Sequence, residues 1–323
     1  MRTITLEEHF ATPEFFDGPA RFVKERAEKI GGRYSIVLDR LCDVGAKRVA
    51  EMDAASIDMQ VLSLSAPGVE QMETADAIPM ARDTNDYLED AIKNYPARFA
   101  GFATVPTGAP EQAAKELEHR VRQGFKGAVI NGHNRGRYLD NQFYWPILEC
   151  AAALNVPIYL HPTPPPQPVI DISYGGFAPM VTDMLAGGAW GWHMETAVHM
   201  IRIVCGGVFD RFPKLQFIIG HMGEGLPFFF QRLDIIPMAT TKLKRPIVSY
   251  LKENVHYTFS GMNFPPTFLD LFLELGGVDR IMFSADYPYQ SMAEAHAFLA
   301  QIPASAADKE RIAHANAERL LGL

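Results

Sequence analysis

The sequence predicts an α/β protein built as a (β/α)8 barrel, the TIM-barrel fold, in one domain that spans residues 1–323. Eight short apolar runs alternate with segments that have the apolar spacing of helices. The central runs are almost entirely apolar, as in parallel strands that helices cover on both faces. An open, doubly wound sheet is the alternative, but no G-x-G-x-x-G motif follows the first strand.

The expected elements alternate regularly along most of the chain. Strands are expected over 3–10, 59–65, 99–105, 126–131, 156–161, 215–221, 255–260 and 280–286. Helices are expected over 40–55, 75–95, 110–123, 143–154, 192–209, 226–236, 265–275, 291–301 and 306–321. Two segments depart from this rhythm. Residues 11–38 are expected to form an insertion or lid without a regular helix, and residues 162–191 a long loop with a covering element.

Composition excludes several classes of partner and location. The formal net charge of -8 argues against binding to nucleic acid or to an anionic membrane. No apolar run approaches the roughly 18 residues of a membrane helix, and the first residues lack the pattern of a signal peptide. Cys42, Cys150 and Cys205 are far apart and form no C-x-x-C pair, which is typical of reduced thiols in a cytoplasmic protein.

Residues that bind metals stand where several of the predicted strands end. Glu7 and His9 end the first strand and point to the same side of it, while His161, His221 and Asp286 end three later strands. Each of them alone could be an ordinary polar strand end, and Asp286 could also be a turn or helix-cap residue. Since chemistry in a barrel occurs at the carboxyl ends of the strands, the pattern predicts one Zn²⁺ or Mn²⁺ site with nitrogen and oxygen ligands.

The segment H-M-G-E-G predicts a paired imidazole and carboxylate. Its glycines allow a tight turn, so that Glu224 can reach back to the ring of His221 and orient it. His193 could also line the same pocket. Arg232 follows two helical turns later, where it could bind a substrate carboxylate or phenolate. A surface ion pair, for example with Asp234, is the equal alternative for this arginine.

Five segments carry a likeness to a known family. They are LEEHF at 6–10, YLHP at 159–162, ETAVH at 195–199, FDRFPKLQFIIGHMGEGLP at 209–227 and RIMFSADYPYQ at 280–290. Together they resemble the metal-dependent aromatic acid decarboxylases of the amidohydrolase superfamily, which act on γ-resorcylate, 2,3-dihydroxybenzoate or 5-carboxyvanillate. The resemblance runs from residue 1 to the C-terminus and implies an amidohydrolase-type barrel with a loop or lid insertion.

The resemblance also implies roles for individual residues. The ligands of one divalent ion, Mn²⁺ or Zn²⁺, would be Glu7, His9, His161 and Asp286. The catalytic residues would be Asp286, His221 and Glu224, and the substrate-binding residues Arg232, Phe10 and Tyr289. Many hydrolases of the superfamily begin instead with His-x-His and use a bridging lysine, where this chain has Glu7 and Asn131. This difference favours a mononuclear decarboxylase.

The implied reaction is the non-oxidative loss of CO₂ from a small hydroxylated aromatic carboxylate, which leaves a phenol. Asp286 would deliver a proton to the ring carbon, and His221 with Glu224 would steer the proton and the charge. The relatives assemble as dimers or tetramers, so a homodimer or homotetramer is expected. A metal-dependent hydrolase of an ester, lactone or amide is the first alternative, and a non-catalytic barrel that binds an aromatic acid is the second.

Overall fold

Short parallel strands form the inner layer of the fold in this computed structural model, which describes residues 1–323 except for the side chains of Arg26, Lys29, Ile30, Arg33 and Tyr34. The strands are β1 (Ile4–Phe10), β2 (Met59–Leu64), β3 (Phe99–Gly101), β4 (Ala103–Thr104), β5 (Ala128–Asn131), β6 (Ile158–His161), β7 (Phe217–Ile219), β8 (Val255–Thr258) and β9 (Ile281–Met282). β3 and β4 act as one barrel strand interrupted at Phe102, whose N–H still donates to Leu62 O at 2.9 Å.

The strands follow one another around the barrel in sequence order. β1, β2 and β3 pair in parallel, and so do β4 to β9. A parallel bridge joins Leu6 of β1 to Ser284, two residues beyond β9, and Leu6 N donates to Phe283 O at 3.1 Å. The eight-stranded barrel predicted from the sequence is therefore confirmed, with strands that are mostly shorter than the apolar runs.

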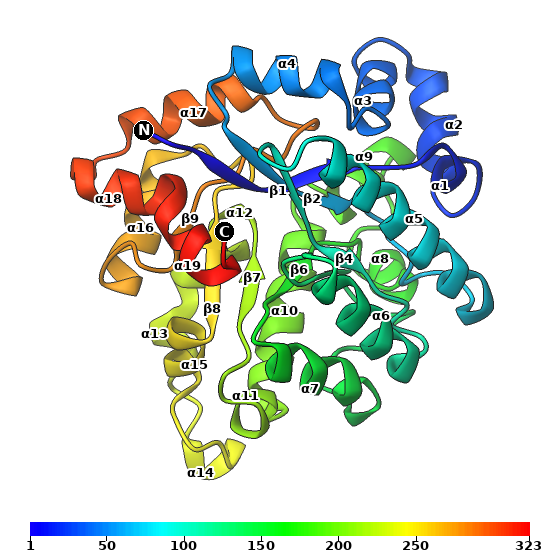
Figure 1. The fold of residues 1–323 in the computed structure, drawn as a ribbon. Coiled ribbons are helices and arrows are strands. Elements are labelled where there is room, and N and C mark those ends of the chain that lie inside the picture. The colour runs from blue at the N-terminus through cyan, green and yellow to red at the C-terminus, as the bar shows by residue number, and fades with distance from the viewer.

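Helices surround the strands and form the outer layer (Figure 1). Before β6 they are α1 (Pro13–Asp17), α2 (Arg21–Ile30), α3 (Arg33–Leu41), α4 (Ala46–Ala54), α5 (Thr74–Asn94), α6 (Pro110–Arg122), η1 (Gln142–Tyr144) and α7 (Trp145–Leu154). Between β6 and β8 they are α8 (Gln167–Ser173), α9 (Pro179–Ala186), α10 (Gly191–Cys205), α11 (Val208–Arg211), α12 (His221–Glu224), η2 (Pro227–Phe229), α13 (Phe230–Leu233), α14 (Met238–Thr241) and α15 (Ile247–Glu253). The last are α16 (Pro265–Leu275), α17 (Met292–Gln301), α18 (Ala306–Glu310), η3 (Arg311–Ala315) and α19 (Asn316–Leu321). Among the described residues, no helix combines the length and the apolar character needed to cross a bilayer.

The expectation of an irregular segment after β1 is wrong, because this segment folds into α1, α2 and α3. Thr12 caps the start of α1 by accepting a hydrogen bond from Phe15 N at 3.2 Å, and Pro13 occupies the first helical turn. Gly31 and Gly32 then separate α2 from α3, with φ of 67° and 58°. Such left-handed backbone ends a helix and suits glycine, so two short helices replace one long one.

Two predicted helices are shorter than expected. The helix predicted over 40–55 begins only at Ala46, because Gly45 has extended backbone at the N-cap. The helix predicted over 226–236 is divided into η2 and α13. Phe228 and Phe229 of this segment are exposed, so little apolar burial holds a longer regular helix there.

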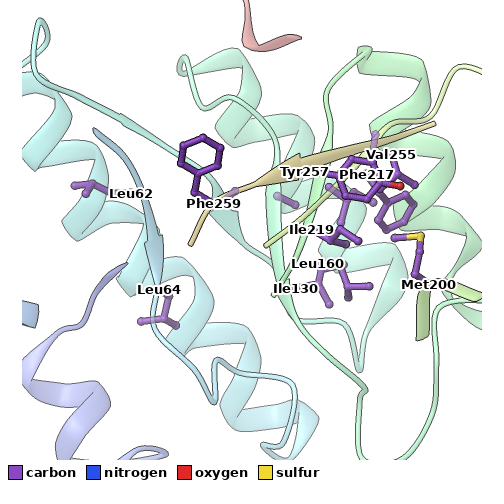
Figure 2. Close-up of a cluster of buried hydrophobic side chains, with 14 of the residues drawn as sticks. Leu62, Leu64, Ile130, Leu160, Met200, Phe217, Ile219, Val255, Tyr257 and Phe259 are labelled. Atoms are coloured by element: carbon purple, nitrogen blue, oxygen red, sulfur yellow. The ribbon is translucent and has the colours of Figure 1, made fainter. Parts of the chain in front are cut away.

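The core has two parts, which the alternation of side chains along each strand separates. On β6, Ile158 and Leu160 face the surrounding helices, whereas Tyr159 faces the barrel interior. Figure 2 shows Leu160 beside Ile219 of β7 and near Met200 of α10, within the outer part. The inner part fills the amino-terminal half of the barrel and includes side chains of α19. The polar strand ends are therefore left at the opposite, carboxyl-terminal end.

Candidate metal centre

A bulge in β1 turns both of its predicted ligands toward the barrel interior. Leu6 belongs to the inner core, so strict alternation would turn Glu7 outward. Instead, the register of β1 against β2 shifts between Thr5 and Glu8, and Glu7 has a φ of 63°. Glu7 and His9 consequently lie on the same side, as predicted, while Glu8 accepts backbone hydrogen bonds from the residues after β9.

Four of the predicted ligands converge at the carboxyl ends of the strands. Potential ligand atoms of Glu7, His9 and His161 all lie within 4.8 Å of one another. Glu7 Oε1 is 3.4 Å from His161 Nε2, and Asp286 Oδ1 is 3.3 Å from His9 Nε2. Glu7, His9 and His161 are buried, and the side chain of Asp286 is 13% exposed.

The donor atoms of this group fit a divalent cation. Glu7 Oε1, both ring nitrogens of His9 and His161 Nδ1 are buried and make no hydrogen bond with the described residues. Buried polar atoms rarely remain without a partner, because their lost hydration is then uncompensated. Burial lowers the pKa of His9 to about 4 and that of His161 to about 3, so both rings are neutral and able to donate a lone pair. Two imidazoles and two carboxylates form a mixed shell that suits Mn²⁺ or Zn²⁺.

The second carboxylate oxygen of Glu7 is held in place by hydroxyl groups. Tyr159 and Ser260 donate hydrogen bonds to Oε2, and Thr258 donates at 3.3 Å. Gly220 lies directly against the same carboxylate, since a Cβ added there would be 2.3 Å from Oε2. The carboxylate is thus fixed at one oxygen, which leaves Oε1 directed toward the two histidines.

The predicted pairing of His221 with Glu224 is present, and a third residue joins it. The backbone from His221 to Glu224 is left-handed, with φ of 50°, 55°, 91° and 56° at successive residues. This tight turn brings Glu224 Oε1 to 2.8 Å from His221 Nδ1, while Glu224 Oε2 lies 2.5 Å from His193 Nδ1. From the sequence alone, His193 is expected only as a residue that could line the pocket.

Charge within this group favours an ion pair. Burial alone would lower the pKa of His221, but the carboxylates of Glu224 and Glu7 raise it to about 10. Burial alone would raise the pKa of Glu224, but His221 and His193 lower it to about 2. A charged imidazole therefore faces the site, because its Nδ1 is also 3.7 Å from Glu7 Oε1.

Asp286 lies at the strand ends beside the predicted ligands. It follows β9 with a φ of 63°, in left-handed backbone that directs the side chain toward His9. Burial, and then the neighbouring Glu7 carboxylate, raise the pKa of Asp286 well above its usual value.

Of the two aromatic residues expected to bind substrate, only Tyr289 lies beside the predicted ligands. Tyr289 lies beside the ligands, with its ring centroid 5.5 Å from that of His9, and its hydroxyl lies 2.6 Å from Ser65 Oγ. Phe10 is fully buried in the outer core, stacked on Tyr87 at a centroid distance of 6.2 Å. Phe10 is therefore directed away from the side of β1 that carries Glu7 and His9.

Arg232 lies on the surface of α13. Its guanidinium group makes no hydrogen bond or ion pair with any side chain that the structure describes. Asp234, the alternative partner, instead accepts a hydrogen bond from Val248 N at 3.0 Å. Within one chain, Arg232 is not brought together with the other predicted site residues.

Trp192 is a site residue that the sequence reasoning missed. Its ring centroid lies 6.4 Å from the rings of both His161 and His221, so the indole covers the space between them. Its Nε1 also approaches His193 Nε2 at 3.1 Å. The available signal was the tryptophan directly before His193 at the start of a helix, but only folding places that turn over the strand ends.

Comparison with known proteins identifies the family. The amidohydrolase family model matches residues 10–323, nearly the whole chain. The chain belongs to the amidohydrolase family. Among curated members, γ-resorcylate decarboxylase of Polaromonas sp. (strain JS666) is 39% identical over 99% of this chain and 98% of its own length. The predicted resemblance to the aromatic acid decarboxylases of this superfamily is confirmed.

Solved structures of amidohydrolase-family decarboxylases share the fold over the full length. The dihydroxybenzoic acid decarboxylase of Polaromonas sp. JS666, with bound manganese and the inhibitor 2-nitroresorcinol, is 38% identical with a TM-score of 0.90, covering 100% of this chain and 97% of that one. The 5-carboxyvanillate decarboxylase of Novosphingobium aromaticivorans, complexed with manganese and 4-hydroxy-3-methoxy-5-nitrobenzoic acid, is 36% identical with a TM-score of 0.92, covering 100% of this chain and 96% of that one.

Proposed function

We propose that this protein is a manganese-dependent decarboxylase that removes CO₂ from a hydroxylated benzoate and leaves a phenol. The observation that carries the proposal is the buried group of Glu7, His9 and His161, with ligand atoms within 4.8 Å, in a chain similar over its full length to decarboxylases of aromatic acids. Relatives named γ-resorcylate decarboxylase support a 2,6-dihydroxybenzoate type of substrate. We infer that the whole chain serves as one barrel domain.

Glu7, His9, His161 and Asp286 are the residues that would hold the ion. The unpaired Oε1 of Glu7 and the unpaired ring nitrogens of His9 support this assignment. A divalent cation held by these residues would supply a Lewis acid that polarises and orients the acidic substrate. Structures of relatives with manganese favour Mn²⁺ over the alternative, Zn²⁺.

Proton transfer to the ring is the step that the protein side chains must perform. Direct cleavage of the bond to CO₂ would leave an aryl carbanion, so the ring carbon takes up a proton before that bond breaks. An ortho-hydroxyl that has lost its proton pushes electron density onto this carbon. Asp286 is the donor best placed for this proton, because its carboxyl group lies at the strand ends beside His9. The carbon–carbon bond electrons then restore the aromatic ring as CO₂ leaves.

His221, Glu224 and His193 position charge around the reacting group. Glu224 lies between the two rings, at 2.8 Å from His221 Nδ1 and 2.5 Å from His193 Nδ1, so neither ring can rotate without losing a hydrogen bond. The positive charge of His221 faces the site and stabilises the phenolate during protonation. Trp192 covers the rings and limits the access of water.

A hydrolase of an ester, lactone or amide is the remaining alternative, because the same ligands could hold an ion that activates water. The test is metal analysis followed by assays of the manganese-loaded protein on a panel of hydroxybenzoates, esters and lactones. We expect about one ion per chain and release of CO₂ together with the matching phenol. Ester or lactone cleavage without any CO₂ release would instead establish the hydrolase.

We further infer that the protein is a cytoplasmic homo-oligomer, a dimer or a tetramer. Large exposed apolar side chains gather on α8 and α9 and again over 228–238, which is typical of surfaces that subunits cover. They include Ile172, Phe177, Met180, Met184, Phe228, Phe229, Ile235 and Met238. All three cysteines are free thiols, as expected in a reducing compartment. Light scattering that gives only the 36.0 kDa mass of one chain would contradict the assembly.

A further inference from the structure

A cavity of about 270 Å³ lies at the amino-terminal end of the barrel, opposite the candidate metal centre. We call it the basal cavity. Its lining residues precede or begin β6 to β9 or belong to α19, and they are Asn155, Val156, Pro157, Lys214, Gln216, His256, Asp279, Arg280, Arg319 and Leu320. The volume is slightly below the roughly 300–1,000 Å³ of pockets that hold drug-sized ligands, which favours a small ligand.

Positive charge dominates the lining of the basal cavity. Lys214, Arg280 and Arg319 face a single acidic residue, Asp279, in a chain whose formal net charge is -8. None of these three cations forms an ion pair with a carboxylate of the side chains that the structure describes. The carboxylate of Asp279 lies 3.4 Å from Arg311 Nη1. Uncompensated cations around one hollow repel one another, and a bound anion would remove that cost.

The hydrogen bonds of Arg280 orient donor groups within this cavity. Its Nη1 donates to Gln216 Oε1 at 2.8 Å and to His256 Nε2 at 3.0 Å, which fixes the guanidinium group at one end. Nε and Nη2 remain without a partner among the described residues. Since His256 Nε2 accepts, the neutral ring carries its proton on Nδ1, and this buried N–H also has no partner.

The protonation of His256 is consistent with a positive local field. Burial, together with Arg280 and Arg319, lowers its pKa to about 3, so the ring stays neutral. Arg319 Nη2 donates to Asp279 O at 2.7 Å and to Asn316 Oδ1 at 2.9 Å, which leaves its other guanidinium nitrogens unpaired among the described residues. Two anchored guanidinium forks and one ammonium group match the several oxygens of a tetrahedral anion.

We propose that the basal cavity binds a small tetrahedral oxyanion of the phosphate type through Lys214, Arg280 and Arg319. This site is separate from the candidate metal centre, since β8 passes between them: His256 lines the cavity, while Thr258 donates to Glu7 Oε2 at 3.3 Å. Phosphate binding therefore does not compete with the aromatic substrate. The same chemistry would accept inorganic phosphate or the phosphate group of a metabolite.

The test is calorimetric titration of the manganese-loaded protein with sodium phosphate, against sodium chloride at equal ionic strength. We expect saturable binding of phosphate and sulfate, and none of acetate or formate. Inhibition of the decarboxylation assay by phosphate should be absent or non-competitive at the concentrations that fill the site. Saturable binding of acetate as tight as that of phosphate would overturn the assignment to tetrahedral anions, and competitive inhibition alone would place the anion at the metal.

Variants locate the site. Lys214→Gln breaks no hydrogen bond of this side chain with the described residues and should weaken phosphate binding about 3-fold, as expected for one exposed charge. Arg280→Met should weaken it about 10-fold or more, because a partly buried, charge-assisted contact is lost. Lys47→Gln removes an exposed charge outside the cavity and is the matched control, expected to bind as the unmodified protein does.

If Arg280→Met fails to fold, the double variant Lys214→Gln/Arg319→Gln provides the same test with exposed residues only. Phosphate binding that is equally tight in Lys214→Gln, the double variant and Lys47→Gln would refute the basal site. Refutation of the basal site would not affect the proposed decarboxylase function, because the CO₂-release test of that function is carried out without phosphate.

Discussion

Replacing Gly220 by alanine should disturb the metal centre through one defined contact. Gly220 has φ of -80° and ψ of -168°, which alanine adopts without strain. The added Cβ would lie 2.3 Å from Glu7 Oε2 and 2.8 Å from Oε1. The hydroxyls of Tyr159, Ser260 and Thr258 hold this carboxylate from the other side. The substitution therefore acts on the position of Glu7 and leaves the local backbone conformation available.

The size of the effect follows from the distance that Glu7 must move. An ordinary contact between non-bonded heavy atoms is about 3.5 Å, so the carboxylate must retreat on the order of 1 Å. Overpacking of this kind costs about 1–3 kcal/mol of unfolding free energy. A ligand displaced from its hydrogen-bonded support should lower manganese affinity by about 10- to 100-fold. We expect kcat at saturating manganese to fall as well, because a shift of about 1 Å in a catalytic site can cost about 10²-fold.

The assay is manganese titration of the metal-free protein, with CO₂ release measured at each concentration. Gly45→Ala is the control: Gly45 also has extended backbone, and its added Cβ would meet only the side chain of Asp43, at 3.3 Å. The control should keep both manganese affinity and kcat. A Gly220→Ala protein with unchanged manganese affinity and unchanged kcat would refute the assignment of Glu7 as a ligand supported by this contact.

Three further outcomes are expected. His221→Ala should lower kcat by about 10²-fold or more while keeping its metal, and a variant with full kcat would remove His221 from the mechanism. Because Arg232 is exposed on α13 and apart from the other site residues of its chain, Arg232→Ala should change KM and kcat little; a large rise in KM with kcat less changed would instead restore it as a substrate-binding residue. His199 should make stability depend on pH, because burial lowers its pKa from 6.5 to about 3 and its Nε2 accepts from Leu139 N at 2.9 Å. The fold favours the neutral ring, so its contribution to the unfolding free energy is complete above pH 6.5. That contribution falls as the pH drops toward 3, by at most about 1.4 kcal/mol per pH unit. Denaturant unfolding of His199→Asn should show an unfolding free energy that depends less steeply on pH.

The candidate site was predictable to the extent that its residues follow strands. The apolar runs before His161 and Asp286 mark buried strands, and the carboxyl ends of barrel strands meet at one face. Their convergence with Glu7 and His9 could therefore be predicted before any distance was known. The turn at Glu224 was predictable for a similar reason, since the glycines around it limit the local backbone conformations.

Residues that reach the site from helices or loops were harder to predict. Trp192 and His193 begin α10 after two helices that carry no periodic signal, and their contacts with His221 and Glu224 depend on how that whole segment returns over the barrel. The helical spacing of Arg232 allows either the pocket mouth or a surface ion pair. The helix is divided into η2 and α13, and Arg232 is exposed on α13.

The number of barrel strands and the residues at their ends can be predicted from local features of the chain, because alternation, apolar runs and turn residues are local properties. The way in which Glu7 enters the site depends instead on tertiary contacts. A strict strand with Leu6 in the inner core would send Glu7 outward, and the bulge that reverses this depends on pairing with β2 and with Ser284 beyond β9. Tertiary contacts also determine which atoms remain free for a metal. The hydroxyls that bind Glu7 Oε2 belong to Tyr159 of β6, Thr258 of β8 and Ser260, all more than 150 positions from Glu7 in the sequence. Such contacts depend on the closure of the barrel, which no local pattern in the chain encodes.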